Sequence, residues 1–88
     1  MNEYNKIFTN ITDEYQRAIS HYPPFASAHE GLAVLWEEFE ELKIEVFKNQ
    51  KTRDYKLMQK EATQVAAMAI RFIIDVAPKK NSIEENTK

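Results

Sequence analysis

The sequence predicts an all-α protein, an antiparallel helical bundle of three main helices that is completed by dimerisation. Two observations predict the helices. Turn residues are scarce, with one glycine and three prolines in 88 residues, and the prolines fall at only two places, Pro23-Pro24 and Pro78. Between these breaks, apolar residues recur at steps of three and four, which is the spacing of amphipathic helices.

The first helix is expected over residues 3–20. Its apolar face is formed by Tyr4, Ile7, Phe8, Ile11, Tyr15, Ala18 and Ile19. The opposite face is polar, and the helix ends before the Pro23-Pro24 pair because proline disfavours the helical conformation of the residue that precedes it.

The second helix is expected over residues 27–48, because Ser27 followed by Glu30 has the form of a capping box. Its core-facing stripe is predicted to consist of Ala28, Leu32, Leu35, Phe39, Leu42 and Val46. Trp36 lies on the flank of this stripe. Trp36 and Phe25 are either core or dimer contacts or aromatic surfaces on which a base could stack.

The third helix is expected over residues 54–76, and after Lys60 it is apolar almost all the way round. Such a helix is normally buried on several sides. Two other helices of one short chain cover only part of it, so the sequence predicts a second subunit. Residues 1–78 are expected to form a single helical domain, and residues 79–88 a polar, flexible tail.

Composition excludes several classes of protein. The absence of cysteine rules out disulfides and thiolate metal sites, and two histidines without cysteine do not suggest a zinc site. A net charge of −2 provides no overall basic field for nucleic acid or an anionic membrane. No run of about 18 uncharged apolar residues is present. A soluble, cytoplasmic protein that binds neither membrane nor nucleic acid is expected.

The stretch "LWEEFEEL" holds four glutamates in five positions. At 100° per residue, Glu38 and Glu41 lie at the border of the apolar stripe, whereas Glu37 and Glu40 point outward. Glu37 and Glu40 are therefore interpreted as solvated surface. Glu38 and Glu41 are interpreted as part of a site, with an ordinary solvated helix face as the alternative.

Glu61 lies within an apolar stripe of the third helix, and Gln64 follows one turn later. An unpaired buried carboxylate is costly, so Glu61 must be neutral, paired with a cation or bound to a metal. If the second and third helices are antiparallel, Glu38 and Glu41 meet Glu61 and Gln64 across their interface. Converging carboxylate oxygens are the ligands that Mg²⁺ prefers, with Mn²⁺ as an alternative ion. The other interpretation is a purely structural bundle.

Basic residues lie along one side of the third helix, next to the acidic residues. They are Arg53, Lys60 and Arg71. At this position they could bind the oxygens of a triphosphate, and the alternative is a solvated basic edge.

Glu37-Glu38-x-x-Glu41, followed by Glu61 and a polar residue three positions later, resembles the EExxE and ExxD motifs of the MazG-like all-α nucleoside triphosphate pyrophosphohydrolases. The matching span is about residues 27–76. The resemblance implies a dimeric or tetrameric helical bundle that uses Mg²⁺ to split a (d)NTP into the monophosphate and pyrophosphate, a hydrolase acting on acid anhydrides.

By position, the resemblance makes Glu38, Glu41 and Glu61 the metal ligands, and Glu37 a residue that positions or activates the attacking water. Gln64 departs from the pattern because it stands where the family has Asp. An amide oxygen can still coordinate a metal, but it brings no negative charge. A second function therefore stays open: a catalytically impaired helical dimer that binds a nucleotide or a protein partner without turnover.

Overall fold

The computed structural model describes residues 2–76, and within this range it contains three helices and no strand. The helices are α1 (Glu3–His21), α2 (Ala28–Val46) and α3 (Tyr55–Asp75). The prediction of an all-α protein is confirmed, and each helix begins and ends within two residues of its expected bounds. The expected tail, residues 79–88, lies outside the described residues.

Each helix starts where a side chain accepts hydrogen bonds from the first backbone N–H groups. The three capping residues are Asn2, Ser27 and Asp54. At the start of α2, Ser27 Oγ accepts from the backbone N–H of Glu30 over 3.1 Å, and the Glu30 carboxylate accepts from the N–H of Ala26 over 2.7 Å. The Ser27 and Glu30 pair thus fixes the start of α2, although Glu30 reaches one residue further back than in a standard capping box.

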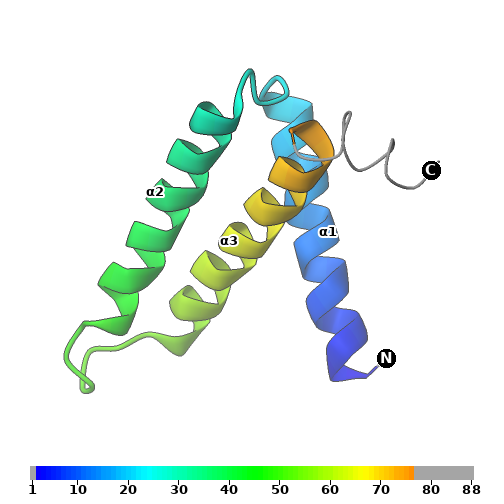
Figure 1. The fold of residues 1–88 in the computed structure, drawn as a ribbon. Coiled ribbons are helices and arrows are strands. Elements are labelled where there is room, and N and C mark those ends of the chain that lie inside the picture. Colours follow the sequence, from blue (N-terminus) through cyan, green and yellow to red (C-terminus); the bar gives the residue numbers. More distant parts are fainter. Residues whose placement is uncertain (1, 77–88) are drawn as a thin grey trace, which may run out of the picture.

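Helix α3 is the central element of the fold. It runs antiparallel to α2 on one side and is crossed by α1 on the other, while the backbones of α1 and α2 stay apart (Figure 1). The antiparallel α2–α3 hairpin brings residues of the middle of α2 next to the first half of α3. This arrangement positions the acidic residues described below.

Few side chains of this fold are fully buried. The buried apolar residues are Ala18, Phe25, Ala67 and Met68. Near them α2 approaches α3 closely at Gly31, where a Cβ atom would lie 2.6 Å from Cδ2 of Phe72 and 3.0 Å from Cδ2 of Phe25. Gly31 is therefore required for the close approach of the two helices, because any larger residue would displace the Phe72 ring.

Arg71 fastens the α1–α2 connection to the end of α3. Its side chain is 3% exposed, and its guanidinium donates to the backbone carbonyls of Tyr22, at 2.9 Å, and of Pro23. Arg71 also pairs with Asp75, as the four-residue spacing predicts, and Asp75 in turn accepts a hydrogen bond from the N–H of Phe25 over 3.0 Å. Burial of Arg71 is thereby compensated by hydrogen bonds and by one carboxylate.

The core-facing stripe expected for α2 is wrong at three positions. Ala28 is exposed, and Leu32 and Phe39 are 51% and 53% exposed, whereas Gly31 is buried and Glu38 is half-buried. The contact of Gly31 with Phe72 explains the difference, because it turns this side of α2 toward α3 and leaves Leu32 and Phe39 on the outer face. Glu38 is consequently brought closer to the interior than the predicted stripe implies.

In the single chain, all three helices carry large apolar side chains that are exposed to solvent. On α1 these include Tyr4, Ile7 and Phe8; on α2, Leu32, Trp36, Phe39 and Ile44; and on α3, Ile70, Ile73 and Ile74. Among residues 2–76, no helix combines the length and the apolar character needed to cross a membrane.

Candidate metal centre

Three carboxylates meet between α2 and α3. Glu38 and Glu41 lie one turn apart on α2, and Glu61 faces them from α3. One carboxylate oxygen of each residue lies within 4.8 Å of the others. The prediction that the two acidic segments meet across the helix interface is confirmed.

Gln64 lies against the same carboxylates. When its amide is oriented to satisfy both of its ends, the nitrogen donates to Oε2 of Glu38 over 3.0 Å and to Oε2 of Glu61 over 3.2 Å. In this orientation Gln64 is a hydrogen-bond donor that bridges the two helices. To act as a metal ligand, as the sequence suggests, its amide would have to turn so that the oxygen faces the carboxylates.

The electrostatic environment favours protonation of the acidic residues. Burial raises the pKa of Glu38, and the neighbouring carboxylates of Glu41 and Glu61 raise it further. Burial also raises the pKa of Glu61, followed by a hydrogen bond and charge repulsion from Glu41, while the charge of Lys60 acts in the opposite direction. The cluster therefore carries an excess of negative charge that a proton or a cation would relieve.

The other two glutamates of the acidic stretch lie outside the cluster. Glu37, the proposed water-activating residue, is exposed on α2 next to Glu38. Glu40 accepts a hydrogen bond from Nε1 of Trp36 over 3.1 Å and lies 3.9 Å from Nζ of Lys43. Glu40 is thus compensated within α2, in addition to the solvation expected from sequence.

The three basic residues expected to bind phosphate lie in different settings. Lys60 is exposed beside Glu61. Arg53 is half-buried and donates from Nη2 to the carbonyl of Val46 over 2.7 Å, so it caps the end of α2. Arg71 is occupied by the loop carbonyls and Asp75 described above. The structure therefore gives Arg53 and Arg71 structural contacts, and of the three only Lys60 extends into solvent near the carboxylates.

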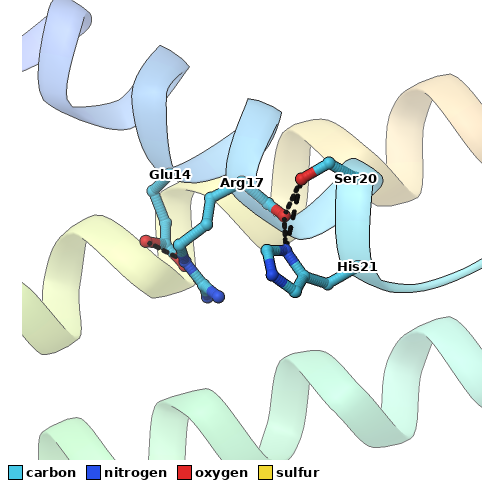
Figure 2. A network of polar contacts seen from close by, with 4 residues as sticks. All are labelled: Glu14, Arg17, Ser20 and His21. Atoms are coloured by element: carbon cyan, nitrogen blue, oxygen red, sulfur yellow. Dashed lines mark hydrogen bonds and ion pairs between the residues drawn. The ribbon is translucent and has the colours of Figure 1, made fainter.

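Helix α1 contributes a basic residue that sequence reasoning missed. Arg17 forms a two-point ion pair with Glu14, with Nη2 2.6 Å from Oε2 and Nε 3.1 Å from Oε1 (Figure 2). This ion pair raises the pKa of Arg17 above its ordinary value, and the carboxylate of Glu38 adds a small contribution. One turn later, Nδ1 of His21 lies 2.8 Å from the carbonyl oxygen of Arg17, and Ser20 bonds to the same carbonyl (Figure 2).

Arg17 and Glu14 reach the neighbourhood of the acidic cluster because α1 crosses α3. Both residues line a cavity of about 380 Å³ together with Glu38 and Gln64. The three-residue spacing of Glu14 and Arg17 predicts their ion pair. It does not predict which way this face of α1 points, since that depends on the crossing of α1 over α3.

Comparison of the chain with protein-family models, with curated proteins and with solved structures found no match in any of the three.

Proposed function

We propose that this protein is a MazG-like nucleotide pyrophosphohydrolase that hydrolyses a (d)NTP to the monophosphate and pyrophosphate with Mg²⁺, or with Mn²⁺ as an alternative. The observation that carries the proposal is the approach of Glu38, Glu41 and Glu61 to within 4.8 Å of one another. The acidic pattern of the sequence supports it because the same residues match the EExxE motif and the Glu of ExxD.

The donor set fits a hard divalent cation. Glu38, Glu41 and Glu61 would hold it through carboxylate oxygens. In octahedral coordination by Mg²⁺, neighbouring oxygens lie about 3.0 Å apart and opposite oxygens about 4.2 Å apart. Oxygens that lie within 4.8 Å of one another would therefore have to move closer by up to about 1.8 Å, which rotation of the glutamate side chains can supply. The bound ion would supply neutralisation of phosphate charge and a water of lowered pKa.

Side chains of the protein would supply the base and the phosphate-binding cation. Glu37 is exposed beside Glu38, so its carboxylate is free to take a proton from the attacking water. Lys60 precedes Glu61 on α3, is exposed to solvent and would offer its ammonium group to the phosphate oxygens. We leave Arg53 and Arg71 out of the proposed phosphate site because their guanidinium groups bind backbone carbonyls.

A second function is favoured by the position of Gln64. Its amide nitrogen bridges Glu38 and Glu61 and so satisfies, without an ion, one carboxylate oxygen of each. This observation favours a nucleotide-binding or protein-binding module that keeps the MazG-like scaffold and has lost turnover. The two functions differ in one measurable quantity, the release of pyrophosphate.

We further propose that the working form is a homodimer or a pair of such dimers. The support is the small number of buried apolar side chains together with the exposed apolar faces of all three helices. A domain of this size is only marginally stable alone, and oligomerisation is a common remedy. Light scattering coupled to size exclusion tests this directly: replacing Leu32 and Phe39 by Ser should yield monomers, and a monomeric wild type would contradict the proposal.

The proposed reaction is tested by measuring pyrophosphate release from a panel of canonical and modified nucleotides, with Mg²⁺, with Mn²⁺ and with EDTA. Glu38→Gln and Glu61→Gln should abolish release. Glu40→Gln is the matched control, because Glu40 lies in the same acidic stretch but outside the cluster. Metal-dependent binding of a nucleotide without release would support the nucleotide-binding module. The absence of both release and binding would refute the reaction and the nucleotide-binding module, and leave the protein-binding module.

A further inference from the structure

Two cavities meet at the side chains of Glu14, Arg17 and Gln64. The first, of about 380 Å³, lies among all three helices, and its apolar lining includes Phe25, Val34 and Met68. We call it the apolar cavity. The second, of about 390 Å³, lies between α1 and α3. We call it the basic cavity because Lys56 and Lys60 line it. Glu14, Arg17 and Gln64 line both.

The acidic cluster borders the place where the two cavities meet. Glu38 lines the apolar cavity, whereas Glu41 and Glu61 line neither. Gln64 lines both cavities and contacts Glu38 and Glu61. A ligand that extends from one cavity to the other would therefore pass Gln64 and come close to Glu38. The apolar cavity falls within the usual size range of small-molecule sites, and it offers an aromatic ring and a thioether to a flat, apolar group.

Charge distinguishes the two cavities. The basic cavity contains three cationic side chains, Arg17, Lys56 and Lys60, against the carboxylates of Asp13 and Glu14, and Glu14 is already paired with Arg17. The apolar cavity has the opposite balance, with the carboxylates of Glu14, Glu30 and Glu38 against the guanidinium groups of Arg17 and Arg71. Arg71 is held by backbone carbonyls and Asp75, so among the described lining residues a polyanion finds no free cation apart from Arg17. A ligand with one apolar planar end and one polyanionic end matches this distribution of charge.

We propose, building on the nucleotide chemistry proposed above, that the nucleoside of the substrate occupies the apolar cavity, that its polyphosphate occupies the basic cavity, and that Arg17 is the residue that positions the phosphates between them. The Glu14 carboxylate holds the Arg17 guanidinium through two parallel hydrogen bonds, in bidentate geometry. A phosphate presents the same pair of acceptor oxygens, so it can replace that carboxylate directly.

Arg17 is the accessible half of this ion pair. Its side chain is 51% exposed, whereas that of Glu14 is 17% exposed, so the guanidinium can turn toward a phosphate while Glu14 stays against the protein. Partly exposed ion pairs of this kind contribute little to stability. Glu14 is correspondingly a competitor of the phosphate. Removing the charge of Glu14 should strengthen phosphate binding, whereas removing the charge of Arg17 should weaken it.

The test is isothermal titration of the full chain with inorganic tripolyphosphate in EDTA at fixed salt. Arg17→Ala should weaken binding by about tenfold or more, as expected for loss of hydrogen bonds to a charged group, and Arg17→Lys should be intermediate. Glu14→Gln should tighten binding several-fold by releasing Arg17, on the scale of an exposed ion pair. Lys51→Ala, an exposed lysine of the α2–α3 connection, is the control and should bind like the wild type.

The outcomes separate this inference from the proposed reaction. Tripolyphosphate binding that depends on Arg17, in a protein that releases no pyrophosphate, would uphold the inference and refute the reaction. Wild-type protein that does not bind tripolyphosphate, or a loss in Lys51→Ala equal to that in Arg17→Ala, would overturn the inference whatever the turnover. If Arg17→Ala does not fold, Arg17→Lys and Glu14→Gln decide: unchanged binding in both overturns it.

Discussion

Replacing Glu61 by Gln should stabilise the ion-free protein near neutral pH. Oxygens of Glu38, Glu41 and Glu61 lie within 4.8 Å of one another. Two unit charges at this distance repel by about 0.9 kcal/mol in a water-like dielectric, and salt at about 0.1 M screens part of that repulsion. Glu61 has two such neighbours, and the charge of Lys60 acts against them. The net gain is therefore about 1 kcal/mol, or a rise in Tm of about 4–8 °C for a domain of this size.

The dependence of Tm on pH provides a second test of the same repulsion. Because the pKa of Glu38 and the pKa of Glu61 are raised in the folded state, the folded protein binds protons more readily than the unfolded chain. This contribution to stability is fully present below the ordinary carboxyl value of 4.5 and is lost as pH rises through the raised values. The wild-type Tm in EDTA should therefore fall from about pH 5 to about pH 7.5, and the Tm of Glu61→Gln should fall less.

Differential scanning calorimetry at both pH values, with and without Mg²⁺, measures these effects. Glu40→Gln serves as the control, because it removes a charge from the same acidic stretch but outside the cluster. Added Mg²⁺ should raise the Tm of the wild type and leave that of Glu61→Gln nearly unchanged. A Glu61→Gln protein that melts below the wild type in EDTA near pH 7.5 would refute the electrostatic reasoning.

Three further predictions concern individual residues. Gly31→Ala should lower the free energy of unfolding in urea by about 1–2 kcal/mol, because overpacking against Phe72 costs more than the helix propensity gained; an unchanged midpoint would contradict this. Arg71→Met should lower it by about 3 kcal/mol, because Asp75 is left without its cation, and unaltered stability would show that Arg71 does not fasten the loop. Gln64→Asp should bind Mg²⁺ more tightly by calorimetric titration, because it adds a negative ligand, and equal or weaker binding would refute a ligand position at residue 64.

Much of the fold follows from local sequence. The caps at Ser27 and Asp54 and the prolines at Pro23-Pro24 determine where helices start and stop, so the helix bounds are readable to within two residues. The antiparallel hairpin follows from the short connection between α2 and α3. Helical periodicity on two antiparallel helices was then enough to bring Glu38, Glu41 and Glu61 together.

Tertiary contacts determine what the helical wheel could not predict. The wheel assigned Leu32 and Phe39 to the core, but the contact of Gly31 with Phe72 rotates α2 and exposes them. A wheel cannot anticipate this, because it ranks residues by hydrophobicity and gives no weight to the close approach that a glycine permits.

The basic residues illustrate a related limit. Arg71 lies on α3 and Arg53 in the connection before it. The Arg53 guanidinium binds the carbonyl of Val46 at the end of α2, and that of Arg71 binds carbonyls of the α1–α2 connection. Sequence gives no information on where loop carbonyls lie. The basic residue nearest the cluster on α1, Arg17, could not be recognised for the same reason: the crossing of α1 over α3 is a property of packing.

Binding of Mn²⁺ measured by electron paramagnetic resonance is the most direct test of the proposed metal centre, because it detects the ion without requiring turnover or a known nucleotide. The carboxylate geometry predicts that the wild type depletes the signal of free Mn²⁺ to about one ion per chain, as expected for one set of oxygen ligands. Mg²⁺ should displace the bound ion, and Glu61→Gln should abolish the binding. Wild-type protein that leaves the added Mn²⁺ free, or Glu61→Gln protein that binds it equally well, would contradict the assignment of Glu38, Glu41 and Glu61 as metal ligands.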